Sequence, residues 1–460
     1  MNKTKALPLA IIVAFGMSNT YAASNQTQSQ TENTQKTQNI VSADNTNQTS
    51  TETKPSDTSN QAPATLPAAG NDQTSASGLS GMNWDLNGVK FNLHGFMSTG
   101  MSISDNAANY NIPGHGNVNQ DANFSTPSLF GLQLNTEITD KLSFMTQIVA
   151  DGDDTNGNTA YQPTVNWMYA QYQATPNIAV RAGRFQIPLY MYSQEIEVGY
   201  NYPYTYLPNE IYRIIPFYSM NGVNLYMQTN LGDSDWNLSF QPFFGESSWD
   251  YDATLMPATI TLAPGVSTTI TNQSMSFKGN KLFGGDLTLS NTIFKIHVAY
   301  AQAAVENTTT LQGNAASVKD QTGRFYSAGA ELNYNHIWAS SEYAHRELNA
   351  PYASLSAYYA SLGYHVEKFM PYVTYAKLWT TNWNDLTNYN NASTSSAVNV
   401  TEVAQGQKSV TLGLNYYYNA NLLLKGSWTY IMPTQGGYGL FQSQPGSNVN
   451  LFTVSANLIF

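Results

Sequence analysis

The feature that most constrains this chain is an alternation of apolar and polar residues with a period of two, which recurs from Trp84 to the last residue. In the final segment, Phe452, Leu458 and Phe460 fall on one face, and the residues between them are mostly polar. Successive side chains of a β-strand point to opposite faces, so the pattern predicts strands with one apolar and one polar face.

The alternation returns in about sixteen segments, each long enough for one strand. The predicted strands are 89–103, 127–138, 141–151, 163–174, 177–187, 220–231, 236–246, 281–290, 292–304, 323–334, 337–347, 352–365, 369–380, 407–418, 422–430 and 449–460.

Short and long connections alternate between these segments, and the longest are 188–219, 247–280 and 381–406. Outer-membrane barrels have short turns at one end and long loops at the other. An even number of strands lets the first strand pair with the last, which leaves no open edge. We therefore predict an all-β fold, a transmembrane antiparallel β-barrel. The alternative, a soluble β-sandwich, accounts neither for the alternating connections nor for the terminal Phe460.

The composition agrees with a barrel that has a wet interior. Charged residues make up 11% of the chain, well below the roughly 25% of soluble domains. Tyrosine occurs 31 times, as expected for aromatic girdles at membrane interfaces. The chain has no cysteine, which excludes thiol chemistry and cysteine-bound zinc. Its net charge of −11 argues against nucleic acid as a partner.

The N-terminal part differs in kind from the rest. Residues 1–22 have a lysine-containing start, an apolar core at Leu7–Phe15 and a small residue at Ala22, which together predict a secretory signal peptide. Residues 23–83 are rich in Asn, Gln, Ser and Thr and contain no aromatic residue, so we expect a disordered periplasmic segment. A flexible spacer is the simpler interpretation, and a periplasmic tether is the alternative. Residues 84–460 are then the barrel, located in the cell outer membrane.

Three stretches resemble known outer-membrane proteins. The last strand, Asn450–Phe460, is similar to their C-terminal assembly signal, with alternating apolar residues and a final aromatic residue. The segment Val180–Tyr212, with Gly-Arg, then Pro, then a loop rich in Tyr and Pro, resembles the trimeric porin superfamily of Gram-negative bacteria, as does the strand Lys90–Met101. Phosphate-selective and dicarboxylate-type porins are the nearest members. The resemblance implies a sixteen-stranded homotrimeric channel whose third long loop folds inward.

The resemblance does not extend to phosphate selectivity. Phosphate-selective members carry many Arg and Lys residues along the lumen, whereas here 30 acidic residues outnumber 19 basic ones. The expected partners are therefore outer-membrane lipid and lipopolysaccharide, further copies of the chain, and small polar solutes of unspecified charge. No cofactor is expected, because a channel performs no covalent chemistry.

A channel needs a constriction whose charges and size select solutes. The third long connection and the strand positions that parity turns inward nominate Arg181, Arg184, Glu195, Glu197, Glu210, Arg213, Lys295, His297, Glu342 and Arg346. Opposed acids and bases across a pore would orient polar solutes. Alternatively, the three loop glutamates Glu195, Glu197 and Glu210 simply hold the loop to the wall through ion pairs. Arg181 and Arg184 are three residues apart, so strict alternation would put them on opposite faces of the strand. A bulge at Gly183, or a position of Arg184 at the rim, would explain how both could serve the pore.

Tyrosine occupies alternate positions at Tyr200, Tyr202, Tyr204 and Tyr206 in the same connection. These rings could form a stacking surface for sugars, but packing and hydrogen bonding within the loop are the favoured interpretation. Two rival functions remain. A barrel hydrolase would need histidine beside a nucleophile, and none of the six histidines lies in such a motif. A surface adhesin or receptor would use the long external loops.

Overall fold

The computed structural model describes residues 81–112, 115–152, 160–215, 217–252, 258–263, 266–270, 273–311, 314–350, 352–386, 399–401, 405–434 and 437–460. The predicted signal peptide and almost all of the predicted low-complexity segment lie outside these residues. None of the helices in the described ranges has the length and hydropathy to span a membrane.

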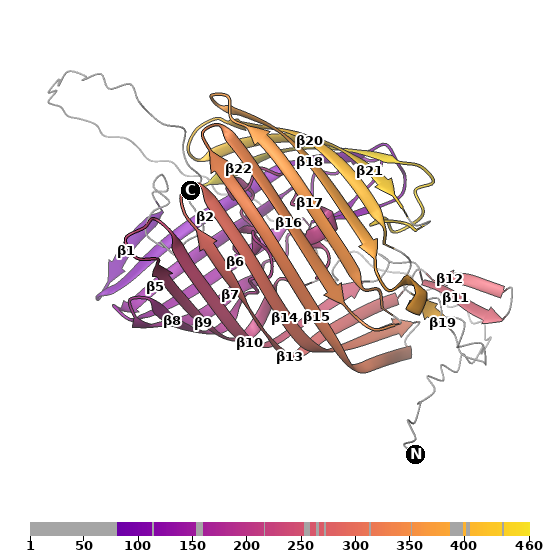
Figure 1. Cartoon of the computed structure of the whole chain (residues 1–460), viewed down its shortest axis with the longest axis horizontal. Coiled ribbons are helices and arrows are strands. Elements are labelled where there is room, and N and C mark those ends of the chain that lie inside the picture. The colour runs from indigo at the N-terminus through magenta and orange to yellow at the C-terminus, as the bar shows by residue number, and fades with distance from the viewer. Residues whose placement is uncertain are drawn as a thin grey trace, which may run out of the picture. The chain divides into compact units, whose positions relative to one another are not determined.

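Sixteen antiparallel strands close into a barrel, as the alternation predicts (Figure 1). Each strand pairs with the next one along the barrel, and β22 pairs with β2. The strands are β2 (Val89–Ser104), β5 (Leu129–Thr139), β6 (Leu142–Asp151), β7 (Thr164–Thr175), β8 (Ile178–Gln186), β9 (Ser219–Asn230), β10 (Asn237–Asp252), β13 (Gln273–Ser290), β14 (Phe294–Leu311), β15 (Asn314–Tyr334), β16 (Ile337–Glu347), β17 (Leu355–Tyr364), β18 (Phe369–Thr380), β20 (Gln407–Tyr417), β21 (Leu422–Pro433) and β22 (Val449–Ile459).

The closing seam is shared by two strands. One edge of β2 pairs with β22 from Phe96 onward, and the N-terminal part of the same edge pairs with β1 (Met82–Leu86). The backbone of Phe460 exchanges hydrogen bonds with the backbone of Gly95. Gly95 lies on β2 between the part that pairs with β1 and the part that pairs with β22. The hairpin between β1 and β2 turns at Asn87 and Gly88, both with positive φ, as a tight two-residue hairpin requires. Strand β1 was not predicted; it extends the pairing of β2 beyond the end of β22.

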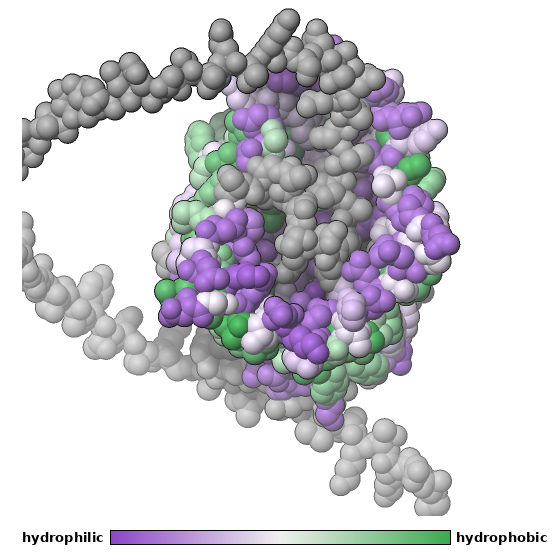
Figure 2. Space-filling view, turned by 90° about the vertical axis from the view of Figure 1, so that its left-hand side faces the viewer, coloured by the Kyte–Doolittle hydropathy of each residue, from purple (hydrophilic) through white to green (hydrophobic). Residues whose placement is uncertain are grey.

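The two faces of the barrel wall follow the predicted alternation. In β14, Phe294, Ile296 and Val298 are each more than two fifths exposed, whereas His297 is buried. In β22, Phe452 and Phe460 are exposed on the outer face, and Leu458 lies on the same face. Figure 2 shows hydrophobic residues along the sides of the barrel and hydrophilic residues at the end that carries the short turns. This distribution fits an apolar outer band between two polar rims.

Four strands are longer than predicted. Strands β10, β13, β14 and β15 continue their pairing through much of the sequence that the alternation assigned to loops, including parts of 247–280. The register shifts at Gly245/Ser247, Asn280/Phe283 and Val305/Asn307, so the irregularities lie side by side on neighbouring strands. A bulge bends a strand and strengthens its twist. Beyond the apolar band a strand can pair without lipid-facing residues, so the alternation ends before the pairing does.

The remaining short elements lie in the long connections. Strands β3 (Tyr110–Ile112) and β4 (Gly116–Val118) pair with each other, and β11 (Ala258–Ala263) pairs with β12 (Val266–Ile270) and β19 (Asn399–Thr401). The connection between β8 and β9 contains η1 (Ser193–Glu195), η2 (Gly199–Asn201) and α1 (Asn209–Tyr212). Most of the buried apolar cluster is formed by this connection and the inner faces of the strands around it.

Candidate functional site

The connection between β8 and β9, residues 187–218, lies inside the barrel; we call it the inward loop. Its backbone and side chains bind inner-face residues of strands far apart around the wall. Leu189 O accepts from Ser327 of β15 at 2.6 Å, and Tyr204 OH donates to Ser361 of β17 at 2.9 Å. On the other side of the barrel, Tyr206 OH lies 2.8 Å from Ser102 Oγ of β2. The loop therefore crosses the interior from wall to wall.

Lys425 of β21 binds the middle of the inward loop. Its side chain is 4% exposed, and its Nζ donates to the carbonyl oxygens of Tyr202 at 2.6 Å and Tyr204 at 2.7 Å, and also to that of Gly199. The ring of Tyr202 lies 4.5 Å from the same ammonium group. This residue was missed in the sequence, although Leu422 and Leu424 on the outer face would have placed Lys425 inward by parity.

Three predicted pore residues bind the backbone of the inward loop from the opposite wall. Lys295 Nζ donates to Met191 O at 2.9 Å, and Glu342 accepts from Met191 N at 2.9 Å. Arg346 Nη1 donates to Ile214 O at 3.0 Å. Parity correctly predicts that these side chains point inward. They are engaged with main-chain groups of the loop.

The three glutamates of the inward loop lie in separate environments. Glu195 has a pKa above its usual range because burial disfavours its charged form, an effect that Lys295 opposes. Burial, together with the charge of Asp151, raises the pKa of Glu197 to about 8. A hydrogen bond from Asn166 Nδ2 at 3.1 Å acts in the opposite direction and lowers this pKa. Burial also raises the pKa of Glu210, although Gln407 Nε2 donates to its Oε1 at 2.7 Å.

Arg181, His297 and Arg213 are each engaged locally. The buried Arg181 donates to Gln171 at 2.8 Å and lies over the rings of Tyr169 and Tyr226. His297 is buried on β14, with Nδ1 3.1 Å from Thr288 Oγ1 and 3.8 Å from Asp286 Oδ2. Arg213 follows α1, and its Nη1 lies 3.5 Å from Leu440 O. Whether these groups act on solutes stays a prediction.

Arg184 lies on the outer face of the wall, not in the lumen. It pairs with Met168 and Asn221, both of which are exposed, and its guanidinium donates to Val165 O at 2.8 Å and Ser219 Oγ at 2.9 Å. The predicted bulge at Gly183 is absent, because the register between β8 and β9 runs through it unchanged. The period of two therefore continues without a break, which puts Arg181 and Arg184 on opposite faces.

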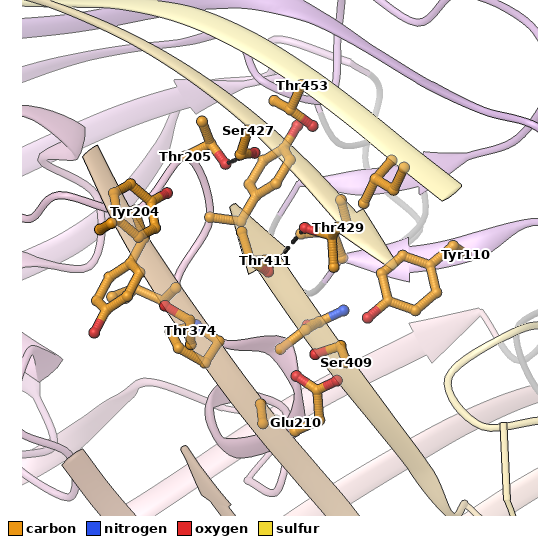
Figure 3. A pocket seen from close by; sticks show the side chains of 18 residues that line it. Tyr110, Tyr204, Thr205, Glu210, Thr374, Ser409, Thr411, Ser427, Thr429 and Thr453 are labelled. Atoms are coloured by element: carbon orange, nitrogen blue, oxygen red, sulfur yellow. Dashed lines mark hydrogen bonds between the residues drawn. The ribbon is translucent and has the colours of Figure 1, made fainter. Parts of the chain in front are cut away.

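A pocket lies between the inward loop and the inner faces of β18, β20, β21 and β22 (Figure 3). We call it the hydroxyl pocket. The loop contributes residues 204–210, and Tyr110 of β3 closes one side. The wall contributes a group of hydroxyl side chains that strand parity turns inward: Thr374, Ser409, Thr411, Ser427, Thr429 and Thr453.

These hydroxyl residues were not singled out from the sequence. Ser and Thr are common on the inner faces of barrels, and only the path of the inward loop shows which of them border a cavity. Glu210 is the one predicted pore residue among those that line the hydroxyl pocket. Of the four alternating tyrosines, Tyr204 and Tyr206 border it, and Tyr202 is buried against the loop backbone, with its hydroxyl 3.1 Å from Ile196 O.

Tyr204 also packs against the wall. Its ring makes edge-on contacts with Trp338, Tyr359 and Tyr372, at centroid distances of 5.5, 5.9 and 5.8 Å. This agrees with the favoured interpretation of these tyrosines as packing residues.

The C-terminal residues lie where an assembly signal would be accessible. Phe460 stacks near Phe130 of β5, with ring centroids 6.5 Å apart, and both rings are exposed on the outer face. The role of Phe452, Leu458 and Phe460 in assembly stays a prediction.

No family model matches this sequence, and no curated protein matches it. Among solved structures, the chain is similar to the anion-selective porin from Comamonas acidovorans at 14% identity, covering 81% of this chain and 100% of that one, with a TM-score of 0.49. It is similar to the outer membrane channel DcaP of Acinetobacter baumannii at 12% identity, covering 83% and 100%, with a TM-score of 0.48. OmpT of Vibrio cholerae matches at 11% identity over 82% and 100%, with a TM-score of 0.49.

Proposed function

We propose that the chain is an outer-membrane porin, a water-filled channel through which small polar solutes or ions diffuse passively, with residues 188–219 as its constriction. The observation that carries this proposal is the asymmetry of the barrel interior. One side of the inward loop packs closely against the wall, and the other side borders the hydroxyl pocket. A barrel of sixteen strands is wide enough to hold a channel, and a loop across it narrows that channel.

The proposal includes export, membrane location and assembly. Residues 1–22 would direct the chain to the periplasm, and the apolar outer face would contact outer-membrane lipid and lipopolysaccharide. A homotrimer is supported by the resemblance of Val180–Tyr212 to the trimeric porin superfamily. Phe452 and Leu458 of β22 and Phe460, the next residue after it, share one face, and Phe452 and Phe460 are exposed, which supports a role of the last strand in membrane assembly.

A hydrolase is less well supported. A catalytic histidine has to reach both a nucleophile and the substrate. His297 lies beside Thr288 and Asp286, which gives it suitable neighbours, but all three side chains are buried, with His297 3% exposed. No described contact favours an adhesin or receptor over a channel.

Planar lipid bilayers test the channel directly. Purified, folded protein should give stepwise increases in conductance, in multiples of three if the trimer forms. The same preparation after heat unfolding is the control and should give none. Folded protein whose electrophoretic mobility changes on heating, but which never conducts, would refute the proposed function.

A further inference from the structure

The hydroxyl pocket differs from an ion-selective site in the chemistry of its lining. Its polar side chains are mostly hydroxyls, and no lysine or arginine is among the described residues that line it. The cations near the inward loop bind main-chain carbonyls instead: Lys425 binds those of Tyr202 and Tyr204, and Lys295 binds that of Met191. An anion in the pocket would therefore find no counter-charge to offset the loss of its water.

Glu210 is the one carboxylate in the lining, and it does not form a strong cation site. It sits in α1 and accepts a hydrogen bond from Gln407 Nε2 at 2.7 Å. Burial raises its pKa, which reduces its tendency to carry a charge. A single, partly neutralised carboxylate compensates poorly for the desolvation of a cation.

Several hydroxyl groups of the pocket form hydrogen-bonded pairs with one another. Thr411 and Thr429 lie 2.9 Å apart, and Thr205 of the loop lies 2.6 Å from Ser427 of the wall, as the dashed lines in Figure 3 show. Each hydroxyl donates and accepts, so a solute hydroxyl can replace either member of a pair in either direction. The tyrosines at the same pocket add flat apolar surfaces beside the hydroxyls, against which the C–H faces of a sugar can pack.

We propose that the hydroxyl pocket admits uncharged polyhydroxylated solutes, such as monosaccharides, in preference to ions of similar size. The proposal rests on the proposed channel function and names its solute class. Neutral polyols match the lining because they exchange hydrogen bonds for hydrogen bonds. Ions of either sign would lose water without gaining a counter-charge.

The test compares three labelled solutes of similar size in proteoliposomes of the full-length protein: glucose, which is neutral, gluconate, an anion, and glucosamine, a cation. The same potassium chloride solution on both sides of the membrane minimises any membrane potential. Glucose should enter several-fold faster than either ion. Entry of gluconate or glucosamine as fast as glucose overturns the solute class and leaves the channel intact. Entry of none of the three, without conductance in planar bilayers, refutes the channel itself.

A double variant, Thr411→Val with Thr429→Val, tests the lining. Valine keeps the shape of threonine and removes the hydroxyl, so glucose entry should fall several-fold while the reversal potential in a salt gradient stays the same. Thr136→Val on β5 is the matched control, since it lies on the outer face in register with Phe91 and Phe144. Unchanged glucose entry through the folded double variant would overturn the role of the hydroxyls. The three-solute comparison on the unaltered protein decides the question independently of how the variant folds.

Discussion

The two sides of the inward loop are built from different chemistry. The packed side, residues 187–202 and 211–215, lies mainly against β14 to β17, with further attachments to β7 at Glu197 and to β21 at Tyr202. Its large buried residues, such as Tyr190 and Ile211, belong to the same apolar cluster as Trp338 of the wall. The open side, residues 204–210, faces β18 to β22 across the hydroxyl pocket. Among the described residues, charged side chains hold the loop at several attachment points, whereas hydroxyls predominate among the polar side chains of the hydroxyl pocket. A charged side chain at the inward loop can therefore serve to hold the loop backbone, whether or not it faces the hydroxyl pocket.

The packed side should be the more sensitive of the two to substitution. Trp338 of β16 is 0% exposed and contacts the rings of Tyr204 and Tyr372. Trp338→Ala should lower the free energy of unfolding by about 3–5 kcal/mol, because the cavity cannot be filled by neighbouring wall residues. Urea unfolding of the variant and of the unaltered protein in detergent measures this difference in the free energy of unfolding.

Ile337→Ala is the control for Trp338→Ala. Ile337 is the neighbouring residue, 41% exposed on the outer face, so its truncation leaves the interior packing unchanged. Equal losses in the two variants would show that the inward loop adds nothing to the stability of the wall.

Lys425 joins the two sides, and its removal should have the next largest effect. In Lys425→Met the carbonyls of Tyr202 and Tyr204 lose their buried donor, at about 1–3 kcal/mol for each group left unsatisfied. Removal of a buried charge offsets part of this loss. We expect a less stable barrel and larger current fluctuations in single-channel records, because the loop is no longer held at its centre.

Lys377→Met on β18 is the matched control for Lys425→Met. Lys377 lies over the ring of Trp379 on the outer face of the wall, and its replacement should leave the current steady. Steady currents in Lys425→Met as well would show that Lys425 does not hold the loop.

Features of the barrel wall that depend on neighbouring residues can be predicted from the sequence. Period-two alternation predicts the strands, the closure at β22 and the inward direction of Lys295, His297 and Glu342, since a shift of one residue would turn every apolar side chain inward. The same rule places Lys425 of β21 on the inner face, opposite to Leu424. These inferences are local, because parity depends only on neighbouring residues.

The path of the inward loop could not be predicted in the same way. Its position depends on contacts with strands as distant in sequence as β2, β15 and β21. The sequence therefore places Glu210 in the long connection after β8, without indicating that Thr411 and Thr429 border the same pocket. Nor does the alternation reveal where β13 to β15 end, because their outer parts pair without an apolar face.

Glu197, on the packed side, should give the stability of the barrel a modest pH dependence. Its pKa is raised to about 8 by burial and by Asp151, so between its ordinary value and 8 the folded state keeps a proton that the unfolded chain releases. Its contribution is complete below about pH 4 and is lost as the pH rises through 8. Unfolding midpoints at pH 5 and pH 9 should therefore differ less in Glu197→Gln than in the unaltered protein. If the midpoints at pH 5 and pH 9 differed equally in Glu197→Gln and in the unaltered protein, the raised pKa of Glu197 would be contradicted.

Arg184 should have the smallest effect of all, although the sequence nominated it for the constriction. Its guanidinium binds Val165 and Ser219 on the outer face, away from both sides of the inward loop. Arg184→Gln should leave the reversal potential in a salt gradient unchanged, because a charge outside the lumen is screened from the pore by the wall. Glu210→Gln, within the hydroxyl pocket, is the comparison and should shift the reversal potential only at a pH above the raised pKa of the Glu210 carboxyl, where that group carries its charge. A shift in Arg184→Gln as large as that in Glu210→Gln would mean that the pore field is set from the outer rim, contrary to the division between the two sides of the loop.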